Sequence, residues 1–298
     1  MGKRWWVTLS ALLLGIAAVL LPHHASEATK VGFTPEPTAA EEPRAAAPRT
    51  SATTTTAPTT TTTGAPAVDL TAAVDKAVAA AGDVDLGLAV LDLDTGAVAG
   101  SQAAAPFHTA SLSKLLVAVD VLGESAVSDS DRDLLTRALS RSDDEAMNAL
   151  WDEHDGMGAV GRVAARAGLT ATSAPADPTQ WGDVEMSADD VVALYHYILT
   201  DLPADQRDFI VTALREAPAT AADGFDQAFG LLGAGADTYA KQGWMWYLPA
   251  TLYLHSSGVV ADRFAVAMLS IHTGQTEQVA KDDLDSITQA LLADLPTG

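Results

Sequence analysis

The chain has 298 residues, of which 48% are hydrophobic, and this is enough to build a sizeable buried core. Its formal net charge of −22 argues against nucleic acid or an anionic membrane surface as the main partner, because Lys and Arg must supply the attraction to phosphate. The absence of cysteine excludes disulfides, thiolate metal sites and a lipid anchor attached through cysteine. Stability must therefore come from packing alone.

Residues 1–28 are predicted to be an export signal. Lys3 and Arg4 form a basic start, and an apolar run follows from Trp5 to Leu21, before small residues that suit a signal peptidase. The run is slightly longer than most cleaved signals and slightly short for a membrane span, so a cleaved signal peptide and an uncleaved signal anchor both stay open. Either alternative places the remainder outside the cytoplasm, secreted or tethered to the membrane.

Residues 29–66 are predicted to be a disordered linker. The segment is rich in Pro and Thr and has too few apolar side chains to offset the entropy lost on ordering. Residues 67–298 then form the folded domain, and most of the acidic excess lies there. We expect this domain to be a monomer.

The folded domain begins and ends with strands and has helices in its middle. Residues 68–82 have helical apolar spacing up to Gly82, and the alternating segment 84–100 turns at Asp94, Thr95 and Gly96 as a hairpin does. Helices are then predicted at 111–122, 130–140, 144–154, 159–168, 187–199 and 204–217, strands at 237–244, 250–260 and 263–272, and a last amphipathic helix at 284–295. This order predicts an α/β (α+β) fold, with a five-stranded antiparallel sheet flanked by the terminal helices and a separate all-helical lobe. A cleft is expected between the two.

A serine precedes a lysine by three residues where the first central helix begins. Ser111 and Lys114 would share one helix face, and Ser111 would lie near the positive end of the helix dipole. Lys114 can accept the Ser111 proton if burial lowers its pKa. The alternative is an ordinary helix start, since serine is a common N-cap. The pair needs supporting motifs.

Two further segments supply that support. The stretch "LSRSDDEAMNALW" places Ser142 at a predicted loop before a helix, although Ser142 and Glu145 also fit a structural capping box. The stretch "YAKQGW" places Lys241 and Gly243 inside a late strand that is followed by two more strands. Each motif is weak alone, but the three occur in a fixed order along the domain.

Together the three motifs resemble those of the class A β-lactamase and penicillin-binding serine transferase superfamily, which are Ser-x-x-Lys, Ser-Asp-Asn and Lys-Thr-Gly. The resemblance covers essentially the whole domain. It implies that Ser111 is the acyl-accepting nucleophile, Lys114 its base partner and Ser142 the relay to the leaving nitrogen. It further implies that Lys241 receives the substrate carboxylate. Backbone N–H groups of Ser111 and of a residue shortly after Gly243 would form the oxyanion hole.

The chain departs from this pattern in its substrate-binding residues. Asp144 stands where the family has Asn, so an ionised side chain that only accepts hydrogen bonds replaces a donor. The same carboxylate would raise the pKa of Lys114 and weaken it as a base. Gln242 stands where the family has Thr and can still donate to a carboxylate. Asp144, Lys241, Gln242 and Gly243 are the predicted substrate-binding residues.

The omega loop also departs from the family, whose members use a Glu there to activate the hydrolytic water. Between Glu153 and Glu185 the chain has no glutamate, and the candidate loop offers only Asp177 and Asp183 as carboxylates. Asp183 matches a structural aspartate of the family, which leaves Asp177 as a weak substitute base. We therefore expect slow hydrolysis of any acyl-enzyme.

Two classes of function stay open at this point. The first is an exported serine hydrolase that forms an acyl-enzyme with β-lactams or peptidoglycan stem peptides, with slow deacylation. The second is a catalytically weak or inactive module that binds cell-wall peptides and keeps the fold. No cofactor is expected. No metal site is expected either, because the histidines have no paired helical spacing.

Overall fold

A computed structural model describes residues 69–235, 237–247 and 249–295 of the chain. The predicted signal segment 1–28 and the predicted linker 29–66 lie outside the described residues.

The core of the domain is one antiparallel sheet of five strands in the order β2-β1-β7-β6-β5. Its strands are β1 (Asp85–Asp92), β2 (Val98–Ser101), β5 (Thr238–Tyr247), β6 (Thr251–Val260) and β7 (Phe264–Thr273). The predicted hairpin is confirmed, because β1 and β2 pair across the turn with Val90 opposite Ala99. Strand β1 then pairs with β7 along its whole length, so the two ends of the domain meet in the sheet.

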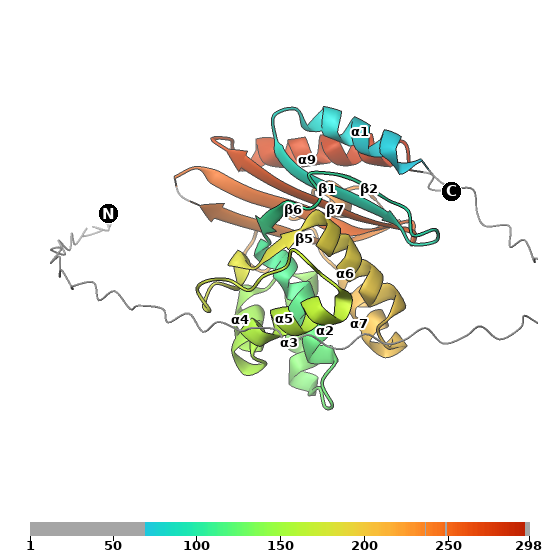
Figure 1. The fold of residues 1–298 in the computed structure, drawn as a ribbon. Helices are drawn as coiled ribbons and strands as arrows, with labels where there is room; N and C mark the ends of the chain where they lie inside the picture. Colours follow the sequence, from blue (N-terminus) through green and yellow to red (C-terminus); the bar gives the residue numbers. More distant parts are fainter. Residues whose placement is uncertain (1–68, 236, 248, 296–298) are drawn as a thin grey trace, which may run out of the picture. The chain divides into compact units, whose positions relative to one another are not determined.

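One face of the sheet is covered by the first and last helices, α1 (Leu70–Ala81) and α9 (Glu277–Leu292), which pack against each other (Figure 1). Both helices bury an apolar stripe, as helical spacing predicts. The short helix α8 (Gly230–Gly233) lies beside α9 on this side. Apolar residues of these helices and of the sheet form one hydrophobic core.

The opposite face carries the helical lobe (Figure 1). Helix α6 (Ala188–Thr200) packs on β1 and β7, and the remaining helices gather around the fully buried helix α2 (Ser113–Leu122). A second hydrophobic core fills this side of the sheet. The helices of the lobe are α2 (Ser113–Leu122), α3 (Asp129–Ser140), α4 (Asp144–Glu153), α5 (Gly156–Ala167), α6 (Ala188–Thr200) and α7 (Ala204–Arg215). The predicted fold class is thus confirmed.

Two short strands, β3 (Pro106–His108) and β4 (Glu185–Ser187), form a small sheet of their own that the sequence did not predict. Strands of three residues are too short to show an alternating pattern. Their pairing holds the segment before Ser111 against the end of the 169–184 loop.

The capping-box interpretation of Ser142 and Glu145 is wrong. The N-cap of α4 is Asp143, whose side chain accepts a hydrogen bond from the backbone N–H of Ala146. Ser142 lies one residue earlier with a φ of 53°, in the left-handed region that residues other than glycine seldom occupy. Ser142 is therefore not used to begin the helix, and its hydroxyl is free for other contacts.

Candidate active site

Ser111 lies in a tight turn that joins β3 to α2. Residues Ala110–Leu112 form a short 3-10 helix that runs directly into α2, and Ala110 before the serine has a φ of 46°. Such a backbone conformation is uncommon for a residue with a Cβ and is held only where the surrounding structure supports it. Ser111 thereby sits at the end of the buried helix α2, one turn from Lys114.

Lys114 is at the centre of the site. Its Nζ lies 2.7 Å from the Ser111 Oγ, 2.9 Å from the Ser142 carbonyl oxygen and 2.6 Å from the Asp144 Oδ1. As an ammonium group Lys114 donates to all three oxygens. As a neutral amine it donates to the Ser142 carbonyl oxygen and the Asp144 carboxylate, which only accept, and it accepts a hydrogen bond from the Ser111 hydroxyl. The same three contacts can therefore form whether Lys114 is protonated or neutral.

Two opposing effects act on the pKa of Lys114. Burial lowers this pKa, because the side chain has no exposed surface, while the carboxylate of Asp144 acts in the opposite direction. The net result is a pKa below the ordinary value for lysine. Asp144 therefore opposes the activation of Lys114 without cancelling it.

Ser142 connects the two buried lysines. Lys241 Nζ donates to the Ser142 Oγ at 2.7 Å and to the Gln242 carbonyl oxygen at 2.9 Å. Lys114 Nζ is 3.5 Å from the same Oγ. Burial together with the charge of Lys114 holds the pKa of Lys241 well below its usual range. The Ser142 hydroxyl accepts from Lys241 and keeps its own proton available to a third group.

Strand β5 forms the wall of the site opposite Ser111. Gly243 lets this strand approach closely, since a Cβ at this position would come 2.8 Å from the carbonyl oxygen of Thr109. The backbone after Gly243 consequently runs beside the turn that carries Ser111, and Trp244 shares a cleft with Ser111.

Gln242 does not face this cleft. Its side chain is buried, and its amide nitrogen donates to the backbone carbonyls of Gln227 and Phe229. Both amide hydrogens are thus used within the protein, and none is left for a substrate carboxylate. Its neighbours in the strand, Lys241 and Gly243, lie at the site.

A cleft of about 470 Å³ opens at Ser111. Trp181 forms part of its wall. The indole lies over Lys114, with Nζ 4.6 Å from the ring centroid. Its Nε1 donates to the Asn148 Oδ1 at 2.8 Å. The cleft is lined by Ala110, Ser111, Asp144, Glu145, Asn148, Thr179, Gln180, Trp181, Gly182, Trp244 and Met245.

The comparisons with known proteins agree with this geometry. The model of the beta-lactamase enzyme family matches residues 69–131, the segment that contains Ser111 and Lys114. A protein of Mycobacterium tuberculosis named "Putative lipoprotein LppW" is 32% identical over 232 residues, which are 74% of this chain and 72% of that protein. Its counterpart in Mycobacterium bovis matches equally well. The chain belongs to the family of this lipoprotein, and its residues 69–131 match the β-lactamase family model.

Solved structures of β-lactamases have the same fold. A β-lactamase from Chitinophaga pinensis superposes with a TM-score of 0.63 at 17% identity, covering 74% of this chain and 98% of the other. A class A β-lactamase from Bacteroides cellulosilyticus gives 0.62 at 15% identity, covering 76% and 99%. At such low sequence identity these superpositions show a common fold and nothing about activity.

The predicted omega loop, residues 169–184, is described completely by the structure and brings no carboxylate to Ser111. Asp177 is exposed and accepts from the backbone and hydroxyl of Thr179 in its own turn. Asp183 accepts from the hydroxyl of Tyr247. The loop contributes Thr179, Gln180, Trp181 and Gly182 to the cleft, so neither aspartate lines it.

The structure brings Ser111, Lys114, Ser142 and Lys241 together and adds residues that sequence reasoning missed. Asn148 and Trp181 are the main additions. The helical spacing of four residues between Asp144 and Asn148 could have indicated the first, because such residues share a helix face. Nothing local marks Trp181, which reaches Lys114 only through the fold of the loop. The chemical roles of the predicted site residues stay predictions.

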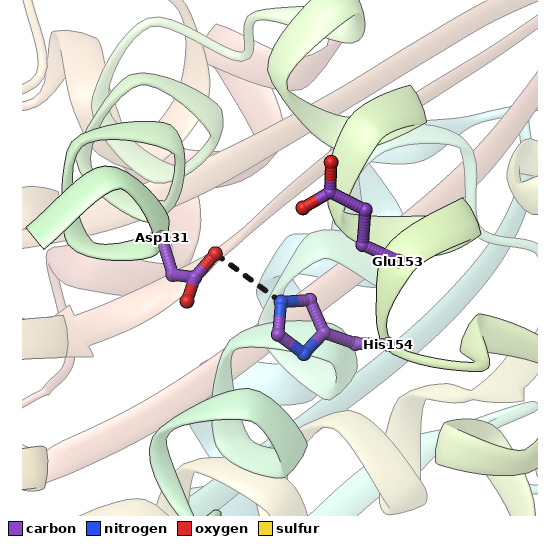
Figure 2. Close-up of side chains that lie close together, drawn as sticks. All are labelled: Asp131, Glu153 and His154. Atoms are coloured by element: carbon purple, nitrogen blue, oxygen red, sulfur yellow. Dashed lines mark hydrogen bonds and ion pairs between the residues drawn. The ribbon is translucent and has the colours of Figure 1, made fainter. Parts of the chain in front are cut away.

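A group of potential metal ligands lies elsewhere, at the C-terminal end of α4. Figure 2 shows Asp131, Glu153 and His154, with ligand atoms within 4.8 Å of one another. His154 already uses both ring nitrogens, Nδ1 with Glu124 at 2.8 Å and Nε2 with Asp131 at 3.3 Å. The ion pairs of His154 with Glu124 and Asp131 thus join the end of α4 to the start of α3.

Among the described helices, none is both long and apolar enough to cross a membrane.

Proposed function

We propose that the protein is an exported serine acyl-transferase or hydrolase that forms an acyl-enzyme on Ser111. The observation that carries this proposal is the 2.7 Å contact between the Ser111 Oγ and the Nζ of Lys114, a lysine whose pKa is lowered by burial. A neutral amine at hydrogen-bond distance is the base that a serine nucleophile needs at moderate pH.

The mechanism assigns one step to each group. Ser111 Oγ attacks the carbonyl carbon of the acyl donor and passes its proton to Lys114. The carbonyl oxygen gains negative charge, which the backbone N–H groups of Ser111 and Trp244 would stabilise from the two sides of the cleft. The bond to the leaving nitrogen then breaks, and the Ser142 hydroxyl delivers its proton to that nitrogen. The Ser142 oxygen regains a proton from Lys114, whose Nζ lies 3.5 Å away. Lys241, at 2.7 Å from the Ser142 Oγ, stabilises the oxygen while its proton is away.

Deacylation is expected to be slow. Hydrolysis of the ester on Ser111 needs a second base and a positioned water. The indole of Trp181 occupies the side of Lys114 that faces the loop, and the loop aspartates point elsewhere. An acyl-enzyme formed on Ser111 should therefore persist.

We infer the substrate class from the β-lactamase-like fold and the location from the predicted export signal. Acyl donors of this type are β-lactams and peptidoglycan stem peptides. The relatives are named as lipoproteins, which supports a position outside the cytoplasm and at the membrane. This chain contains no cysteine, so its tether would be the apolar segment within residues 1–28.

A catalytically weak module that binds cell-wall peptides is the second candidate. The observation that favours it is the ion pair of 2.6 Å between Lys114 Nζ and Asp144 Oδ1. This pair stabilises the ammonium form of Lys114, which cannot accept a proton.

Exposure to a fluorescent penicillin, followed by intact mass measurement, tests the proposal. We expect a single penicilloyl adduct on Ser111 that is long-lived, is absent in Ser111→Ala, and gives little steady-state hydrolysis. Rapid multiple turnover would show that the chain has a deacylating base after all. A folded protein that gives no adduct with penicillin or with an uncharged activated ester would favour the binding module.

A further inference from the structure

The charge of the cleft is opposite to what a carboxylate-bearing substrate needs. Two of the residues that line it, Asp144 and Glu145, carry carboxylates, and no Lys or Arg is among the lining residues. The side chain of Asp144 is 58% exposed, and Glu145 is exposed as well. Within the described part of the chain, Glu145 forms no ion pair. A ligand in this cleft therefore meets negative charge beside the nucleophile.

The two site lysines do not reverse this charge. Lys114 and Lys241 are each 1% exposed and lie behind the cleft wall, where both have lowered pKa values. Lys114 is paired with Asp144, and Lys241 is bound to Ser142 and to a backbone carbonyl. Neither ammonium group presents surface on which a substrate carboxylate can dock.

The rim of the cleft adds to the negative potential. The indole of Trp244 lines the cleft and donates from Nε1 to Asp223 Oδ2 at 3.3 Å, so a third exposed carboxylate lies at this edge. The whole chain carries a formal charge of −22, which strengthens the field at its surface. Trp181 and Trp244 also offer aromatic surface, and indole rings are the best aromatic partners of cations.

We propose that this cleft prefers an acyl donor with a positively charged amine close to its reactive carbonyl to a donor with a carboxylate there. The ammonium group is held by Glu145, by the exposed oxygen of Asp144 and by the indoles. This inference rests on the proposed acylation of Ser111 and deepens it by naming the charge class of the substrate.

Three p-nitrophenyl esters of equal chain length test the inference. One has a trimethylammoniobutanoyl chain, one replaces the trimethylammonium group by an uncharged tert-butyl group, and one is the monoester of glutarate, which ends in a carboxylate. In each case the Ser111 Oγ forms an ester with the acyl carbon, p-nitrophenolate leaves, and the Ser111 proton passes to Lys114. Intact mass and the release of p-nitrophenolate give the second-order rate constant of acylation.

We expect the cationic ester to acylate Ser111 roughly tenfold faster than its uncharged isostere, and the anionic ester to be slowest. The preference for the cation should shrink as the salt concentration rises, because screening weakens exposed charges. In Glu145→Gln the ratio of cationic to uncharged rates should fall several-fold towards one. Glu153→Gln removes the same charge from an exposed position at the other end of the same helix, outside the cleft, and should keep the wild-type ratio.

The outcomes separate this inference from the function on which it rests. Equal rates for the three esters, or a faster anionic ester, with labelling that still requires Ser111, would overturn the charge preference and leave the acylation intact. Loss of the ratio in Glu153→Gln to the same degree as in Glu145→Gln would also overturn it, since the effect would then belong to net charge. No labelling by any ester in the folded protein would overturn the proposed acylation, and the inference with it.

Discussion

For single residues, the proposed activity of the site depends on the two opposing effects that set the pKa of Lys114. Burial lowers the pKa of this lysine and the Asp144 carboxylate raises it, so one exposed side chain controls how much neutral amine is present at a given pH. The sequence correctly predicted the direction of the Asp144 effect. It could not predict that burial would outweigh it, because burial is a property of the folded lobe.

Replacing Asp144 with Asn should therefore speed acylation. The change removes an anion and restores a donor, which lowers the pKa of Lys114 further and moves the rising limb of the pH–rate profile to lower pH. At a pH below the pKa of Lys114, the neutral fraction of the amine rises about tenfold when that pKa falls by one. The uncharged ester is the suitable probe, because it feels no direct attraction to Asp144.

Asp223→Asn is the matched control, since Asp223 acts on Lys114 only through its charge and without a hydrogen bond. Its effect should be clearly smaller. Unchanged or slower labelling in Asp144→Asn would show that Asp144 has another role, such as orienting Lys114 towards Ser111.

At the scale of elements, a buried histidine ties the small sheet to the large one. His255 on β6 donates from Nε2 to the carbonyl oxygen of His108 on β3 at 2.8 Å, and its Nδ1 accepts from the backbone N–H of Ser270 on β7 at 3.1 Å. Both ring nitrogens are thus satisfied only in the neutral form. Strand β3 leads directly to Ser111, so this contact also supports the nucleophile.

Acidification should lower the free energy of unfolding, because His255 binds a proton more readily in the unfolded state. Burial lowers the pKa of His255 to about 4, from 6.5, so the unfolded state binds this proton first as the pH falls. The stabilisation is fully present above pH 6.5 and is lost as the pH drops towards 4. We expect about 2 kcal/mol less free energy of unfolding at pH 5 than at pH 7.5 from this group, measured by urea denaturation.

The comparison of variants isolates this effect, because His272 is also buried with a lowered pKa and acts in the same direction. His255→Gln should be less stable at neutral pH but lose less stability on acidification. His196→Gln removes an exposed histidine and should keep the wild-type pH dependence. Equal pH dependence in His255→Gln and wild type would contradict the assignment.

At the scale of the whole molecule, the two ends of the domain depend on each other. Strand β1 pairs with β7, and α1 packs against α9, so the first and last elements share one core. Such a core cannot form until nearly the whole domain has been made. This arrangement predicts a single cooperative unit.

A fragment of residues 67–298 should accordingly fold by itself. Its thermal midpoint by circular dichroism and its labelling on Ser111 should equal those of the full chain, because no element of the described core lies before residue 69. A shorter fragment, 67–276, lacks α9 and its buried Ala280, Leu284, Ile287 and Leu291, and should show no cooperative transition. A cooperative transition in 67–276, or two transitions in 67–298, would contradict the single unit.

Local patterns in the sequence were enough to predict the order of the main helices and strands and the three motifs of the site. Long segments with a clear apolar period, such as α3 and α6, can be predicted because a local pattern decides which face is buried. Ser111 and Lys114 are also local, since one helical turn brings them together. Short elements such as β3 and β4 lack enough residues to show a period, and tertiary contacts decide them.

The surroundings of these groups depend on tertiary contacts. Trp181 lies over Lys114 because a loop folds back across the cleft, and Gln242 turns into the core because backbone carbonyls there accept its amide. The burial of Lys114 and Lys241, and hence their lowered pKa values, arises from packing between segments far apart in the chain. Distances, burial and charge balance depend on these long-range contacts, which no local pattern of residues encodes.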